Sequence, residues 1–137
     1  MPPRTPVPCL ERAVATARGW RAIVVHDDDA TRELATNVLR DAGYGVTAFT
    51  SPMQVLDTMD AATRIGVVVT RVNFGSGTLN GVALARMVRL RQPATKIVFV
   101  ALDENRGYTA ELGEFLPMPL DPKALADVVG RLLVEPA

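Results

Sequence analysis

The run Ile-Gly-Val-Val-Val-Thr at residues 65–70 is the feature that most restricts the fold of this chain. It is short, β-branched and apolar without alternation, which is typical of a strand buried on both faces of a parallel sheet. The run ends at Arg71, and a loop rich in small residues follows at 73–81. In open parallel sheets, ligands bind beyond the carboxyl ends of the strands. Arg71 therefore lies where function is expected, and it offers a guanidinium.

Strands and helices are predicted to alternate along the rest of the chain. Such alternation implies right-handed βαβ units, with helices on both faces of a parallel sheet. The segment 103–113 is weakly helical at best, because Gly107 lies in its middle. Strands are predicted at 20–26, 45–49, 65–70, 96–101 and 114–116, and the clearer helices at 30–42, 52–61, 82–91 and 122–134. The helix at 82–91 is expected to bury Leu84, Met87, Val88 and Leu90.

Length and composition indicate one soluble domain of the cytoplasm. A chain of 137 residues can bury one core. Fifteen basic and fifteen acidic residues cancel, so no nucleic-acid or membrane partner is expected. The single cysteine, Cys9, excludes an internal disulfide and suits a reducing compartment. No apolar run approaches the roughly 18 residues of a membrane span.

The chain is expected to divide into an N-terminal extension at 1–19 and a domain at 20–135. The extension begins with a proline-rich stretch. Its residues 9–18 place apolar side chains on one helical face, so they could form a short amphipathic helix that packs on the domain or links it to another. A frayed extension is the equally weighted alternative.

Six segments, taken in order, resemble the receiver domain of bacterial response regulators, the CheY-like module of two-component (phosphorelay) signal transduction. The resemblance covers about residues 20–134. It implies a flavodoxin-like (βα)5 three-layer sandwich with a parallel sheet of order 2-1-3-4-5. The segment between Ala101 and Met118 is shorter than is usual in the family, so the fourth helix is expected to be short or irregular. The segments are residues 23–29, 39–44, 67–73, 80–85, 97–100 and 115–122.

The resemblance also implies a chemistry, the transfer of a phosphoryl group from a histidine kinase to an aspartate at the end of the third strand. That aspartate and two acidic residues after the first strand bind Mg²⁺ as oxygen ligands. A lysine near the fifth strand and the metal offset the charge of the phosphoryl group. A hydroxyl at the end of the fourth strand and an aromatic residue on the fifth strand then move, which changes the partner-binding surface.

Carried over by position, the acidic pocket of the family is only partly present in this sequence. Its first acidic position falls on His26, its second on Asp27, and Asp28 follows. The phosphoacceptor position falls on Arg71. Asn73, whose backbone carbonyl would face the metal, is kept. The resemblance therefore implies a pseudo-receiver that lacks the phosphoacceptor aspartate and is expected to have lost Mg²⁺ binding, with no other cofactor in its place.

The remaining family positions also depart from the pattern. The hydroxyl position falls on Ala101 and the lysine position on Met118. Phe115 takes the place of the switching aromatic, and Pro119, which follows a cis bond in the family, is kept. A receiver fold without receiver chemistry is expected. Its function would be that of a non-enzymatic, phosphorylation-independent interaction module, which binds signalling proteins through the surface at 103–134.

Two interpretations of Arg71 remain open from the sequence. Its guanidinium could reach Asp27 or Asp28 and fix the pocket in one conformation, or it could point into solvent. Pairing is favoured because the neighbours are acidic. His26 is expected to be structural rather than a metal ligand, since Arg71 would repel a cation.

Alternatives to the interaction module also remain. A small flavodoxin-like protein could reuse the pocket around Arg71 for an anion or a nucleotide, although the chain lacks a glycine-rich phosphate loop. The chain could also be one receiver of a hybrid kinase or multidomain regulator. Arg86, Arg89 and Arg91 are interpreted as a solvated helix face.

Overall fold

The computed structural model describes residues 20–59, 64–72, 74, 79–109 and 111–133. The extension at 1–19 with its expected helix, and Asn73, lie outside the described residues. The strands form one parallel sheet of order β2-β1-β3-β4-β5, as expected for the flavodoxin-like fold. The strands are β1 (Trp20–Val25), β2 (Gly45–Phe49), β3 (Arg64–Thr70), β4 (Lys96–Ala101) and β5 (Glu114–Pro117).

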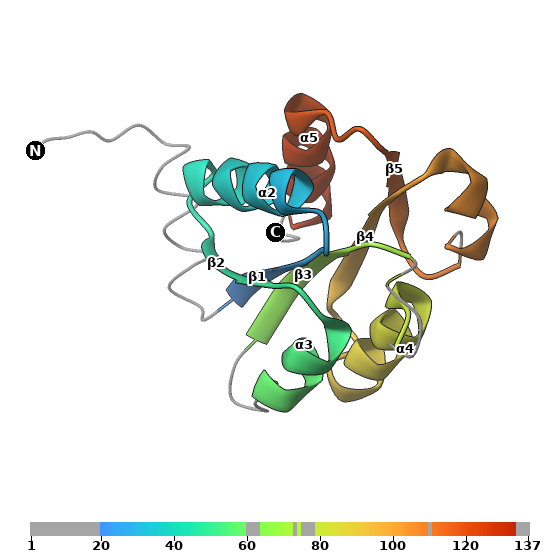
Figure 1. Ribbon diagram of the computed structural model, residues 1–137. Coiled ribbons are helices and arrows are strands. Elements are labelled where there is room, and N and C mark those ends of the chain that lie inside the picture. The colour runs from blue at the N-terminus through green and yellow to red at the C-terminus, as the bar shows by residue number, and fades with distance from the viewer. Residues whose placement is uncertain (1–19, 60–63, 73, 75–78, 110, 134–137) are drawn as a thin grey trace, which may run out of the picture.

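Helices cover both faces of this sheet, which gives the three-layer sandwich visible in Figure 1. One apolar core lies between the sheet and α2 and α5, and a second lies between the sheet and α3 and α4. Val67 and Val69 of β3 belong to the first core and Val68 to the second, so the central strand is buried on both sides. The helices are α2 (Asp29–Asp41), α3 (Pro52–Thr58), α4 (Gly81–Arg91), the 3-10 helix η1 (Asp103–Tyr108) and α5 (Pro122–Leu132).

Polar side chains and a glycine mark the ends of two helices. Asp28 caps α2 by accepting a hydrogen bond from the backbone N–H of Thr31. The chain leaves α2 at Gly43, whose φ of 96° lies in the left-handed region that favours glycine. Ser51 and Gln54 form a capping box on α3. Among the described helices, none is long and apolar enough to cross a membrane.

The expected shortening of the fourth helix is confirmed. Between β4 and β5, the described residues form the 3-10 helix η1 and no α-helix, and η1 ends at Tyr108, next to Gly107 in sequence. Most expected boundaries agree to within one residue, but two helices end earlier than expected, α3 at Thr58 and α5 at Leu132.

The expectation that Met87 and Leu90 are buried is wrong. The buried face of α4 consists of Gly81, Leu84, Ala85 and Val88. Leu90 is 84% exposed and Met87 is 40% exposed. The sheet contacts only one narrow side of the helix, and at 3.6 residues per turn Leu90 points away from that side.

Gly81 marks a close approach between α4 and the end of β3. A Cβ atom at this position would lie 1.7 Å from the carbonyl oxygen of Arg71. The backbone N–H of Gly81 donates to the carbonyl of Val72 at 2.8 Å. The absence of a side chain therefore lets the start of α4 hold the backbone that carries Arg71.

We expect Gly81→Ala to lower the free energy of unfolding by about 1–3 kcal/mol, because the new methyl group overlaps a backbone atom. Urea denaturation measures the change. Gly130→Ala in α5 is the matched control, since nothing lies within 4 Å of its added Cβ. This control should gain about 0.5–1 kcal/mol from helix propensity. Equal effects of the two substitutions would contradict the close approach.

Candidate functional site

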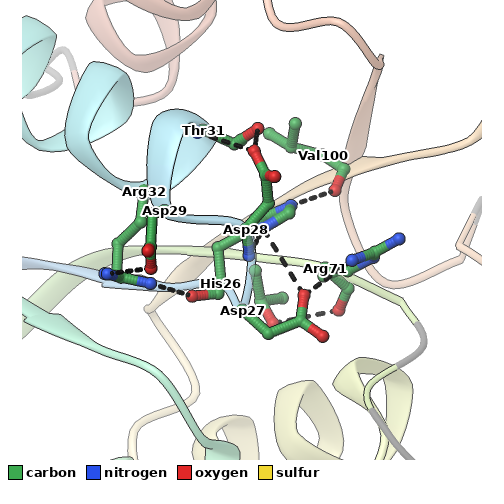
Figure 2. A network of polar contacts seen from close by, with 9 residues as sticks. His26, Asp27, Asp28, Asp29, Thr31, Arg32, Arg71 and Val100 are labelled. Carbon is green, nitrogen blue, oxygen red and sulfur yellow. Dashed lines mark hydrogen bonds and ion pairs between the residues drawn. The ribbon is translucent and has the colours of Figure 1, made fainter.

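Four of the residues singled out in the sequence meet at the carboxyl ends of β1 and β3. His26, Asp27 and Asp28 follow the last residue of β1, and Arg71 follows the last residue of β3. The two strands are paired with Val25 opposite Thr70, so the residues beyond them are neighbours across the sheet. Figure 2 shows the four residues at this edge, with Asp27 facing Arg71 and Asp28 facing Thr31.

Arg71 forms an ion pair with Asp27. Its Nη1 atom donates to Oδ1 of Asp27 at 2.6 Å, and the two side chains are 26% and 40% exposed. The expected pairing of Arg71 with an acidic neighbour is therefore confirmed, with Asp27 as the partner. The contact is charge-assisted, but water reaches both groups and screens it.

Asp28 is occupied by the helix that follows it. Its Oδ2 atom accepts from the backbone N–H of Thr31 at 2.9 Å and from the Thr31 hydroxyl at 2.6 Å. These two hydrogen bonds favour the charged carboxylate and lower the pKa of Asp28 below its ordinary value. The carboxylate of Asp28 thus caps α2, and the described contacts do not join it to Arg71.

His26 is buried and ties two strands that are not adjacent. The side chain is 1% exposed. Its Nδ1 atom accepts from the backbone N–H of Asp28 at 3.1 Å, and its Nε2 atom lies 3.2 Å from the carbonyl oxygen of Val100. These partners assign the proton to Nε2, which donates to Val100. Val100 belongs to β4, and β3 lies between β1 and β4, so the imidazole bridges across the central strand.

Burial is the main cause of a lowered pKa for His26, because the protonated ring would lose its hydration. The Arg71 cation lowers the pKa further, whereas the Val100 carbonyl, Asp27 and Asp28 act in the opposite direction. His26 is therefore neutral near pH 7 and acts as a structural residue, as expected from the sequence.

Arg32 fixes the backbone of this loop, a role that sequence analysis missed. Its Nη1 atom donates to the carbonyl of His26 at 3.0 Å, and its Nη2 atom donates to Asp29 at 2.6 Å. The arginine one turn into α2 was a possible signal, since it can reach back to the loop that precedes the helix.

The residues present do not fit Mg²⁺. Hard cations take several oxygen ligands, preferably carboxylates. Here Asp27 is paired with a cation, and Asp28 accepts hydrogen bonds from Thr31. Both ring nitrogens of His26 are hydrogen-bonded, Nε2 as a donor and Nδ1 as an acceptor. Within the described part of the chain, no cluster of three His, Cys, Asp or Glu residues could hold a metal ion.

The side chains of the other three candidate residues take no part in the described hydrogen bonds and ion pairs of this network. Ala101 is fully buried in the core under α3 and α4, and Phe115 packs against the same core. Met118 packs against the opposite core and donates its backbone N–H to the carbonyl of Ala101 at 2.9 Å. The peptide bond between Met118 and Pro119 is cis. The described contacts do not join Phe115 or Met118 to Arg71.

Arg106 covers Phe115, a contact that no pattern in the sequence indicated. The guanidinium carbon lies 4.5 Å from the centre of the Phe115 ring, which is a cation–π distance. Nε and Nη2 of Arg106 both donate to Asp103 at 3.1 and 2.9 Å. The aromatic side chain on β5 is therefore held from its outer side.

Two hollows of the described surface lie away from Arg71. One of about 250 Å³ lies at the amino ends of β3 and β4 and includes Thr95 and Lys96. Another of about 280 Å³ lies beside β5 and includes Gly113. Neither is lined by the residues around Arg71, so these hollows give no support to an anion site there.

Comparisons with known proteins agree on one family. The sequence profile of the family described as "Response regulator receiver domain" matches residues 22–129. The protein named "Sensor kinase CckA" of Brucella abortus (strain 2308) is 29% identical over 131 residues. The match covers 90% of this chain, and the chain spans only 14% of the length of that kinase.

Solved receiver domains have the same fold. The structure titled "BeF3 Activated DrrB Receiver Domain" matches with a TM-score of 0.71 and 25% identity, over 83% of this chain and 97% of that one. A response regulator receiver protein from Sinorhizobium medicae WSM419 matches with a TM-score of 0.74 and 23% identity, over 85% and 96% of the two chains. At this identity the second likeness concerns the fold alone.

The lowered pKa of His26 predicts a pH dependence of stability. As pH falls, His26 is protonated near its ordinary pKa of 6.5 in the unfolded chain and only at a lower pH in the folded chain. The unfolded state then binds more protons, so the free energy of unfolding falls as pH decreases, by at most about 1.4 kcal/mol per pH unit. We expect His26→Gln to remove this slope in urea denaturation between about pH 7.5 and pH 5.

The pH dependence due to Asp28 falls in a different pH range from that due to His26. The pKa of Asp28 is lowered from 3.8, so its contribution to stability is lost only as pH falls below that value. If the free energy of unfolding changed equally with pH above pH 5 in the wild type and in His26→Gln, the assignment of His26 as a buried neutral imidazole would be contradicted.

A double-mutant cycle measures the Arg71–Asp27 pair. For Arg71→Met and Asp27→Asn, we expect a coupling of about 0.5–1 kcal/mol in the free energy of unfolding, because both side chains are partly exposed. The coupling should shrink in about 1 M salt. The same cycle on Arg131 and Glu114, which are 3.4 Å apart and more exposed, is the control and should give almost none. A larger coupling in the control would overturn this ranking.

Proposed function

This chain belongs to the response regulator receiver domain family, and we propose that it acts there as a pseudo-receiver, a protein-interaction module that needs no phosphoryl transfer. Receiver domains are signalling modules of two-component systems rather than enzymes. The observation that carries the proposal is the ion pair between Arg71 and Asp27 at the end of the central strand. In the family, by the resemblance described above, an aspartate acceptor occupies that position.

The chemistry of the side chains supports this proposal. A guanidinium is protonated at any physiological pH, so Arg71 offers neither an oxygen nucleophile nor a metal ligand. His26 is neutral, buried and satisfied at both ring nitrogens. Asp27 is the remaining carboxylate that faces Arg71, and it is already paired with a cation. We therefore propose that Mg²⁺ binding is lost together with the acceptor.

The positions that would stabilise a phosphoryl group are apolar. Ala101 has no hydroxyl and Met118 has no charge, so neither could offset the negative oxygens of a bound phosphoryl group. Ala101 is 0% exposed and Met118 packs against the core. Both residues are well accounted for as core residues.

Two contacts support a fixed rather than a switching surface. Arg71 joins the ends of β1 and β3 through Asp27, and Arg106 covers Phe115 while paired with Asp103. A receiver held in one conformation could present a constant surface to its partner. We propose that this surface comprises η1, β5 and α5, within residues 103–134, and that the partner is a signalling protein of the cytoplasm.

A phosphodonor experiment tests the proposal. We expect incubation with Mg²⁺ and acetyl phosphate to add no phosphoryl group, because the acceptor carboxylate is missing. Intact-mass measurement gives the result directly. Beryllofluoride with Mg²⁺ is likewise expected to leave the amide NMR spectrum unchanged. A stoichiometric acyl phosphate on the wild-type chain would overturn the proposal.

Arg71→Asp sharpens the test, because it restores a carboxylate beside Asp27. We expect calorimetry to show Mg²⁺ affinity at least about tenfold above that of the wild type, equivalent to about 1.4 kcal/mol. Arg40→Asp in α2 makes the same change of charge at an exposed position in the last turn of that helix, and it should not gain affinity. Equal gains in both variants would mean that net charge alone is responsible.

A further inference from the structure

The exposed side of α4 carries a compact surface that the proposed function does not use. We call it the α4 patch and define it as Arg86, Met87, Leu90 and Arg91. All four side chains are exposed, and Leu90 reaches 84%. Residues three and four apart are neighbours on a helix, so Met87 lies beside Leu90, Arg86 beside Leu90 and Arg91 beside Met87. The patch is thus an apolar pair bordered by an arginine on each side.

The packing of α4 does not account for this patch. The helix is held to the sheet by its opposite side, through Leu84, Ala85 and Val88. Basic residues in the last turn are favourable for a helix, which explains Arg91. That effect does not explain an exposed leucine and methionine, since apolar side chains gain free energy only when water is removed from them.

We propose that the α4 patch binds an acidic amphipathic helix of a partner protein. Apolar side chains of that helix would cover Met87 and Leu90, and its carboxylates would pair with Arg86 and Arg91. The argument is charge complementarity, because α4 has three arginines and no acidic residue. Arginine binds carboxylates in a two-point geometry, which adds specificity to the contact. The α4 patch shares no residue with the surface at 103–134.

Two other occupants match the α4 patch less well. The segment 1–19 of the same chain carries Arg4, Arg12 and Arg18 against a single acid, Glu11, so it would bring like charge to the patch. A nucleic acid would satisfy the arginines through its phosphates, but it would leave the apolar pair without a counterpart. A helix with both acidic and apolar side chains serves all four residues.

A display library of helical peptides tests this proposal on the full 137-residue chain. Every peptide carries leucines at helical spacing, and the flanking positions are random. We expect the selected peptides to be enriched in Asp and Glu at the flanks. Binding of a selected synthetic peptide should weaken at least about tenfold with Leu90→Ser and about threefold with Arg86→Ala, and it should weaken in high salt.

Matched variants keep the test specific. Leu102→Ser removes another leucine that is 47% exposed, and Arg40→Ala removes an arginine of α2. Both should bind the peptide as the wild type does, and circular dichroism with thermal unfolding confirms that all variants are folded. The proposal is overturned if the selected flanks are not acidic, or if Leu90→Ser binds equally well. It is also overturned if a duplex DNA or a peptide of residues 1–19 competes for the patch, or if Leu90→Ser abolishes a wild-type dimer.

Discussion

Burial of β3 on both faces decides where the polar chemistry of this chain can lie. Val67, Val68 and Val69 are at most 1% exposed, so the strand offers water and ligands only its ends. Its carboxyl end lies beside that of β1. The side-chain hydrogen bond between Arg71 and Asp27 joins these two ends, and that of His26 reaches Val100 of β4. Gly81 completes the arrangement, because only a residue without a side chain can lie against the Arg71 carbonyl.

Two ties of different strength hold this end of the sheet. The Arg71–Asp27 pair is short but partly exposed, and such pairs are worth about 0–1 kcal/mol. The His26 bridge to Val100 is buried, and a broken buried hydrogen bond costs more because its partner is left unsatisfied. The ion pair therefore contributes less to the stability of the fold than the buried hydrogen bond of the imidazole does. Within the described residues, every buried side-chain nitrogen or oxygen has a partner.

Local signals predicted most of the fold. The alternation of strands and helices and the weak helix at 103–113 follow from patterns within a few residues, whereas the strand order was implied by the resemblance to receiver domains. The pairing of Arg71 was predictable from its acidic neighbours, although the choice of Asp27 was not. The prediction that Met87 and Leu90 are buried was wrong for a simple reason. The sequence shows that the helix has apolar residues, but it does not show how many of them the sheet will cover.

The amino-acid sequence by itself determined the parallel α/β fold and the guanidinium at the end of the central strand, because both depend on residue type and order along the chain. Only the tertiary structure decided that Asp27 is the partner of Arg71, that His26 reaches Val100 across β3, and that Arg106 lies over Phe115. Val100 lies 74 residues from His26 along the chain. Such contacts depend on the register of the sheet and the direction of each side chain, which exist only once the strands have paired.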